Sequence, residues 1–277
     1  MNASISNLAA NCCEVWRLAT RHLGQCVQVF EEVDSTNSRA LAVAGQPDTA
    51  GLAFLADQQR AGRGQHGRTW TAPARSSVLL SVLLYPPASV ARPVLLTAWA
   101  AVAVCTLVER LTGQTTRIKW PNDVFLAGKK VCGILIEQSQ LPTCLASVVG
   151  IGLNLQQRAE DFRQANLPDA TSLALAGVAD LDNRAVARLL LHELDWQYEQ
   201  LLLGQLDRLE EAWRERLDLV GQRVFVEGIS DNRTGQLLHL GFDSIRLLRD
   251  SGQVETFAPE SIRHIQLDPT FFSALPD

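Results

Sequence analysis

The chain has 277 residues, of which 47% are hydrophobic and 20% charged, and its formal net charge at pH 7 is −5. This length and apolar content suffice for one large domain, or for a large and a small one, with a substantial core. A slightly negative chain without a dense run of Lys and Arg gives no electrostatic indication of nucleic-acid binding. The N-terminus lacks the basic start and apolar run of a signal peptide. Polar and charged residues interrupt the apolar segment 94–111, which indicates a buried helix and not a membrane span.

The six cysteines indicate a reducing compartment. None of them forms a Cys-x-x-Cys pair, and several lie in apolar runs typical of core strands and helices. Such cysteines are typical of reduced core thiols in a cytoplasmic protein, and their spacing argues against a zinc site. They are Cys12, Cys13, Cys26, Cys105, Cys132 and Cys144.

The first half of the chain alternates strand and helix signals. Apolar residues at helical spacing predict a weak helix over 11–23, and alternation predicts a strand over 27–30. The polar run 34–38 supplies turn and helix-capping chemistry for a helix over 38–44. Apolar runs predict buried strands at 51–56 and 77–85. Pro93 and Gly113 suit the first turn and the C-terminal cap of the long helix between them.

The second half predicts short strands, a helical stretch and then a small β domain. Strands are expected over 116–120, 124–126, 131–138 and 144–154, and helices over 182–216 with a break near Gly204. After residue 219, short β runs separated by turns suit a small closed barrel; they cover 223–227, 234–240, 244–249, 253–258 and 262–265. We therefore expect a lead over 1–25, a mixed α/β domain over 26–217, and a small β-barrel domain with a tail over 218–277.

The stretch 57–70 combines glycines and arginines directly after a buried strand. Glycine allows left-handed backbone angles and close approach of a ligand to the main chain. Arginine offers a planar, permanently charged donor suited to phosphate oxygens. The stretch indicates a loop for a phosphorylated ligand, although a solvated surface hairpin remains an alternative. It is not a Walker loop, and no helix start follows it, so the dinucleotide interpretation fails in this context.

Three ordered motifs resemble those of biotin–protein ligases. They are Gly62-Arg63-Gly64-Gln65-His66-Gly67-Arg68 with Trp70, Lys119-Trp120-Pro121-Asn122-Asp123, and Lys130-Val131-Cys132-Gly133-Ile134-Leu135-Ile136-Glu137. The resemblance covers most of residues 30–265. It implies a mixed α/β catalytic core like that of biotin and lipoate ligases and class II aminoacyl-tRNA synthetases, followed by a small SH3-like β-barrel.

The resemblance also implies a biotin pocket. The turn Ser35-Thr36-Asn37 and Gln59 would hold the ureido ring, for which hydroxyls and amides are suitable partners. Taken alone, the turn is equally typical of a helix cap, and Gln59 of a polar strand end. The other residues implied in biotin binding are Arg63, Gly64, Gln65, Lys130 and Gly133. Gln65 departs from the family, which usually has arginine there to retain the reactive adenylate, and this departure places tight retention in doubt.

For nucleotide binding the resemblance implies Arg63, Arg68, Trp70, Lys119, Asn122 and Asn154. Lys130 and Arg63 are the implied catalytic cations, with Lys130 neutralising the biotin carboxylate and the α-phosphate as they approach. Lys129 is expected to face the opposite side of the strand. Asp123 is a weak magnesium candidate, since the phosphates could hold the ion and Asp123 could instead position a lysine. An Asx turn at Asn122, a capping role for Asn154, and a solvated loop position for His66 remain open.

The implied activity is ATP- and Mg²⁺-dependent adenylation of biotin, followed by transfer to a lysine of a biotin carboxyl carrier domain, for example on acetyl-CoA carboxylase. A lipoate or octanoate ligase is the alternative enzyme. A repressor that uses biotinyl-adenylate as corepressor is the alternative of another class. About twenty-five residues before the first strand are too few for its DNA-binding module, so we expect neither specific DNA nor a membrane as a partner. The sequence leaves homodimer formation open.

Overall fold

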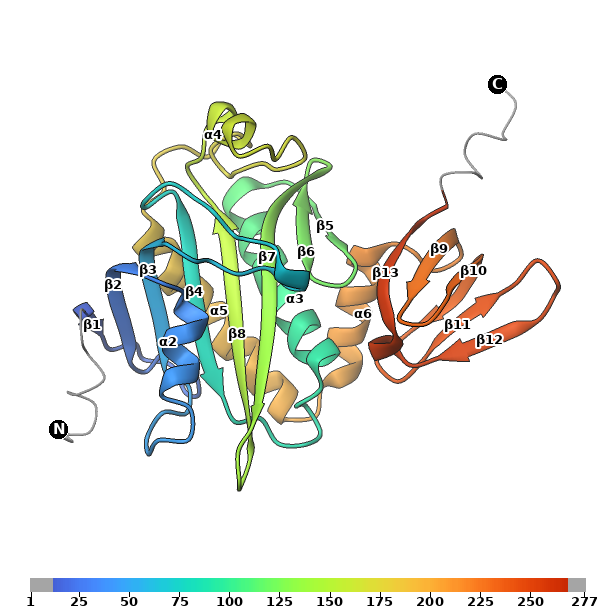
Figure 1. Cartoon of the computed structure of the whole chain (residues 1–277), viewed down its shortest axis with the longest axis horizontal. Helices are drawn as coiled ribbons and strands as arrows, with labels where there is room; N and C mark the ends of the chain where they lie inside the picture. The colour runs from blue at the N-terminus through green and yellow to red at the C-terminus, as the bar shows by residue number, and fades with distance from the viewer. Residues whose placement is uncertain (1–11, 269–277) are drawn as a thin grey trace.

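The computed structural model describes residues 12–268 and contains two β-sheets (Figure 1). The larger sheet has eight strands in the order β1-β2-β3-β4-β8-β7-β6-β5. Only β2 and β3 pair in parallel; the other neighbours are antiparallel. The strands are β1 (Cys12–Trp16), β2 (Val27–Val33), β3 (Ala53–Gln59), β4 (Ser77–Leu84), β5 (Thr116–Lys119), β6 (Asp123–Leu126), β7 (Lys129–Gln140) and β8 (Leu145–Asn154).

Helices cover the two faces of this sheet unequally. The helices α3 (Pro93–Thr112), α5 (Asn183–Leu202) and α6 (Leu206–Leu217) pack on one face and form the larger hydrophobic core with it. The short helix α2 (Thr36–Ala42) packs on the other face over a smaller core, and α4 (Ala159–Gln164) lies beyond the end of β8. Because both faces are covered, a central strand such as β4 is buried at every position, as its largely apolar sequence predicts.

The expectation for the long apolar helix is confirmed. α3 is long and apolar enough to cross a membrane, but 72% of its apolar window is buried inside the fold, so it is a core helix. Pro93 occupies its first turn, and Gly113 ends it with φ at 68°, a left-handed cap. The predicted break near Gly204 separates α5 from α6.

The predicted N-terminal helix over 11–23 is wrong. Residues Cys12–Trp16 form β1 instead and pair antiparallel with β2, with Trp16 buried in the larger core. The few apolar residues at helical spacing were too weak a signal, because a short helix is only marginally stable by itself. Pairing with the edge of β2 satisfies the backbone groups of both strands. Residues 1–11 of the expected lead and 269–277 of the expected tail lie outside the described residues.

The second sheet follows α6 and is the small β unit that the sequence predicts. Its strands are β9 (Arg223–Gly228), β10 (Asn232–Leu240), β11 (Ile245–Leu248), β12 (Val254–Phe257) and β13 (Ile262–Leu267). Their order is β12-β11-β10-β9-β13, and all neighbours pair antiparallel, which agrees with the small β domain that was expected. Trp213 of α6 stacks on Phe242 of this unit with ring centroids 5.1 Å apart, and Arg92 pairs with its Asp243 and Glu260.

The six cysteines are free, but they are not uniformly in the core. Cys26, Cys105 and Cys132 are buried, whereas Cys13 is exposed. Burial raises the pKa of the Cys105 thiol to about 11 and that of the Cys132 thiol well above its usual range. These two thiols are therefore core residues and not nucleophiles.

Candidate active site

A cavity of about 520 Å³ lies where the loop between β3 and β4 crosses the sheet in front of β8 and β7 (Figure 1). Every residue that the sequence proposed for biotin, nucleotide or metal lines it. They are Ser35, Thr36, Asn37, Gln59, Arg63, Gly64, Gln65, Arg68, Trp70, Lys119, Asn122, Asp123, Lys130, Gly133 and Asn154. Five separate segments of the chain thus meet at one hollow, which random scatter of polar residues would not produce.

Glycines on β7 and β8 form the wall of this cavity. A Cβ atom at Gly152 would lie 2.5 Å from the Trp70 ring, and one at Gly133 would lie 2.9 Å from it. A Cβ at Gly150 would lie 2.3 Å from Asn37 Oδ1. The wall therefore needs glycine at these positions, because the indole and the amide occupy the space that side chains would fill.

The predicted biotin turn is a connected polar cluster. The backbone N–H and the hydroxyl of Thr36 both donate to Gln59 Oε1, at 2.7 and 3.1 Å. Ser81 on β4 contacts the Thr36 hydroxyl at 2.7 Å and also Asn37 Oδ1. Ser35 occupies the N-cap position of α2 but makes no side-chain capping bond. Its side chain therefore does not act as the helix cap that the sequence alone allowed.

Arg63 is held at the cavity by Glu137, a residue whose role the sequence did not assign. Arg63 Nη2 and Asn37 Nδ2 both donate to Glu137 Oε2, each at 2.7 Å, and Arg63 Nη1 donates to Ser38 Oγ at 2.9 Å. Glu137 therefore joins the loop, α2 and β7. It closes the third sequence motif, but only the structure shows which neighbours it contacts.

Lys130 and Asp123 form an ion pair inside the cavity, with Nζ and Oδ1 2.7 Å apart. Lys130 Nζ also lies 5.8 Å from the centre of the Trp70 ring. The backbone of Lys130 is fixed by hydrogen bonds to Asp169 and from Thr171, both at 2.8 Å. Lys129 is exposed and does not line the cavity, so the strand separates the two lysines as expected.

The donor set does not fit a magnesium ion held by the protein alone. Asp123 is engaged by Lys130, and no group of three or more His, Cys, Asp or Glu side chains within residues 12–268 could hold a metal ion. Of the two roles that the sequence left for Asp123, the geometry supports positioning of a lysine.

The second motif and Asn154 use their amides to hold backbone. Asn122 Nδ2 donates to Ile134 O at 2.7 Å, which ties the turn before β6 to β7. Asn154 Nδ2 donates to Thr171 O at 3.0 Å, and its Oδ1 accepts from Gln157. Both asparagines therefore have a structural role, but these bonds are neither the Asx turn nor the helix cap that the sequence left open. Lys119 lies at the cavity with Nζ 5.6 Å from the Phe125 ring.

The second sheet also reaches the cavity, which the sequence did not predict. His264, Ile265 and Gln266 of β13 line it, and the His264 ring lies 6.0 Å from the ring of His66 at the loop tip. His66 is exposed, as expected of a loop residue, but it is not free of contacts. Alternation along a strand predicts which residues face outward but not which other element they meet.

Comparisons with known proteins agree with this geometry. The profile of the biotin/lipoate A/B protein ligase family matches residues 29–154. The biotin–[acetyl-CoA-carboxylase] ligase of Mycobacterium tuberculosis is 38% identical over 209 residues, which are 73% of this chain and 74% of that protein. The bifunctional ligase/repressor BirA of Bacillus subtilis is 29% identical over 232 residues, 83% of this chain and 71% of that protein.

A solved structure shares the fold. The biotin protein ligase from Aquifex aeolicus in complex with biotin and ATP superposes with a TM-score of 0.71 at 25% identity, covering 87% of this chain and 99% of that one. The catalytic sheet, the five-stranded second sheet and the three motifs around one cavity are thus accounted for together. The chain belongs to the biotin–protein ligase family.

Proposed function

We propose that this chain joins biotin to a lysine of a carrier protein in two steps at the cavity between the loop and the sheet. The observation that carries this is the convergence of the three motifs on one cavity, with the Lys130–Asp123 pair at its floor. The related ligase named for acetyl-CoA carboxylase and the Aquifex complex with biotin and ATP support it.

In the first step a carboxylate oxygen of biotin attacks the α-phosphorus of ATP, the bond to the β-phosphate oxygen breaks, and pyrophosphate leaves. Negative charge gathers on the phosphate oxygens and must be stabilised by fixed cations. Lys130 is such a cation: Asp123 and the backbone contacts of β7 hold it in place before the substrates arrive. Arg63 is a second cation, kept beside the cavity by Glu137.

The polar cluster around Thr36 suits the ureido ring of biotin. That ring presents one strong acceptor and two donors, and Ser35, Asn37 and Gln59 provide hydroxyl and amide partners at one end of the cavity. Because Thr36 and Gln59 are already linked, their side chains are held before the ligand binds. A pre-ordered site loses less entropy on binding than one that must form.

Arg68, Trp70 and Lys119 are the proposed nucleotide partners, together with the backbone around Asn122 and Asn154. Magnesium would enter with the phosphates and would help to neutralise their charge. In the second step the amine of the carrier lysine attacks the carbonyl carbon of biotinyl-adenylate, loses a proton and expels AMP.

We propose that the two sheets belong to two domains of this enzyme. We also propose that it works in the cytoplasm, where ATP and the carrier protein are.

Mixing the protein with ATP, Mg²⁺, biotin and an apo carrier domain tests this proposal, with the mass of the carrier as the readout. We expect the mass increase of one biotin amide on one lysine, and Lys130→Ala should slow its appearance strongly. Lipoate and octanoate in place of biotin form the comparison, because the matching family also includes lipoate ligases. Modification by those acids and not by biotin would overturn the proposal in favour of the alternative enzyme.

A further inference from the structure

The loop that covers the cavity is attached to the core at both of its ends. At its start the N–H groups of Arg60 and Ala61 donate to Val33 O and Asp34 O, each at 2.9 Å. Its centre is a small hairpin in which Trp70 N donates to Gly62 O at 2.9 Å. At its far end the backbone returns to β3 where Arg75 N donates to Asp57 O at 2.8 Å.

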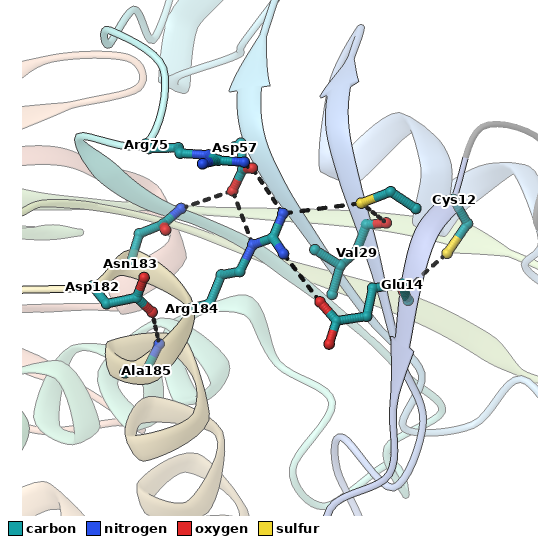
Figure 2. Close-up of polar contacts among 10 residues, drawn as sticks. Cys12, Glu14, Val29, Asp57, Arg75, Asp182, Asn183, Arg184 and Ala185 are labelled. Carbon is teal, nitrogen blue, oxygen red and sulfur yellow. Dashed lines mark hydrogen bonds and ion pairs between the residues drawn. The ribbon is translucent and has the colours of Figure 1, made fainter.

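Asp57 fastens this far end with its side chain as well (Figure 2). Arg75 Nε and Arg184 Nη2 both donate to Asp57 Oδ2 at 2.9 Å, and Asn183 Nδ2 donates to Oδ1 at 3.1 Å. The Asp57 side chain is only 4% exposed. Arg184 continues the network to Glu14 of β1, at 3.0 Å. One buried carboxylate therefore joins β3, the loop, the start of α5 and the N-terminal strand.

The two arginines on this carboxylate belong to different parts of the molecule. Arg184 is on α5, with its side chain 23% exposed, so its bonds hold a helix to the sheet. Arg75 belongs to the loop and lies two residues before the start of β4. Its side chain is 67% exposed. The backbone of Arg75 has a φ of 59°, which a non-glycine residue seldom adopts. The backbone preference of arginine therefore does not favour this conformation, and contacts with other residues must stabilise it. The bonds to Asp57 hold it, and the next residue, Ser76, is held separately by the N–H groups of Leu155 and Gln156, which donate to its carbonyl at 2.9 Å.

We infer that Asp57 and Arg75 form a clasp that sets how far the loop reaches over the cavity. Trp70, which rests against Gly133 and Gly152, is five residues before Arg75, and the intervening segment 71–74 has only short-range ties. Releasing Arg75 frees this segment and lets Trp70 and Arg68 move away from the wall. Asp57 is thus a positioning residue: it acts through Arg75 and does not touch the cavity itself.

Two matched variants separate the clasp from the stability of the fold. Arg75→Gln and Arg184→Gln each remove one cation from the same carboxylate and keep a long polar side chain. The first readout is trypsin cleavage after Arg63 and Arg68 in the ligand-free protein, followed by mass. We expect Arg75→Gln to speed this cleavage about fivefold, roughly 1 kcal/mol of loop opening, with little change in global unfolding by urea. Arg184→Gln should lower the unfolding midpoint and speed loop cleavage less.

The second readout rests on the proposed function. Arg75→Gln should raise the KM for ATP and the dissociation rate of biotinyl-adenylate, because Arg68 and Trp70 are the proposed nucleotide partners. It should leave kcat within about twofold, because the wall and Lys130 are untouched. Arg75→Lys, which restores a cation at the clasp, should recover part of the difference. Equal cleavage of the loop in wild type and Arg75→Gln, or a larger effect in Arg184→Gln, would overturn the inference. Absence of ligation by the wild type would refute the proposed function but leave the cleavage result to decide the clasp.

Discussion

The two sides of the cavity are built differently. The wall consists of β7 and β8, whose backbones are hydrogen-bonded along their length and whose glycines leave room for the indole and for the biotin turn. The cover is the loop 60–75, which is largely exposed and is held by its ends, by the Arg63–Glu137 pair and by the ring contact of His66. On the proposed function, the wall fixes where the reacting atoms lie, whereas the cover contributes Arg63 to the chemistry and otherwise determines how long the ligands stay. Changes to the wall should therefore impair chemistry or binding outright, and changes to the cover at residues other than Arg63 should mainly alter dissociation.

The largest effect is expected at the wall, from Lys130→Ala. Removing the cation should cost about 2 to 4 kcal/mol of transition-state stabilisation, which is roughly a 30- to 1000-fold loss of kcat/KM. Lys129→Ala is the matched control and should stay near wild type, because the neighbouring side chain is exposed and outside the cavity. Pyrophosphate release measures both. Equal losses in the two variants would show that charge near the strand matters and not its placement in the cavity.

The next largest effect is expected from Gly152→Ala, which changes the contact between β8 of the wall and Trp70 of the cover. The added methyl group would lie 2.5 Å from the Trp70 ring, so the indole must move. Overpacking of this kind costs about 1 to 3 kcal/mol, and we expect this cost to weaken ATP binding measured by calorimetry, because Trp70 is a proposed nucleotide partner. The fold should keep its unfolding midpoint, because Trp70 belongs to the loop.

A double variant tests the origin of that loss. Replacing Trp70 by leucine removes the ring, so Gly152→Ala should cost less in Trp70→Leu than in the wild type. Additive losses would mean that the methyl group acts on something other than Trp70.

The wall was more predictable from the sequence than the cover. Apolar runs and glycines in β7 and β8 predict both the strands and their close approach to a ligand, because period and composition are local properties. The helix predicted over 11–23 failed because β1 depends on pairing with β2, a contact that no local signal carries. The residues of the loop identified it as a ligand-binding loop. They did not predict the contacts that hold it to the rest of the fold.

The residues missed at the site have the same cause. Ser81 lies within a strand predicted from its apolar residues and was not singled out, and Glu137 was named only as the end of a motif. His264 of the second sheet gave no signal at all, since its contact with His66 joins segments almost two hundred residues apart. For the same reason the network of Asp57 could not be foreseen: its partners come from β1, the loop and α5.

A smaller effect is expected on the cover, at Gln65. A glutamine amide offers neutral hydrogen bonds to phosphate where an arginine would offer charged and bidentate ones, a difference of about 1 to 2 kcal/mol. Gln65→Arg should therefore slow the dissociation of biotinyl-adenylate by roughly tenfold. Arg60 does not compensate in the wild type, because it lies outside the cavity and pairs with Glu32. Labelled adenylate measures the rate, and an unchanged rate would assign retention to other loop residues.

The smallest effect is a pH dependence at the base of the cover. Burial alone would raise the pKa of Asp57, but the hydrogen bonds from Arg184, Asn183 and Arg75 outweigh it, so its pKa lies below the usual value of 3.8. A carboxylate with a lowered pKa stabilises the folded state above its unfolded pKa, and this stabilisation is lost as the pH falls through the folded pKa. The difference in unfolding free energy between wild type and Asp57→Asn should therefore be constant from about pH 5 to 7. Below about pH 4 it should shrink, by at most about 1.4 kcal/mol per pH unit for one proton. Urea unfolding at a series of pH values measures this, and trypsin cleavage of the loop at pH 6 is the companion readout, since Asp57→Asn should open the loop there. A difference that stays constant down to pH 3 would mean that the negative charge of Asp57 does not hold the clasp.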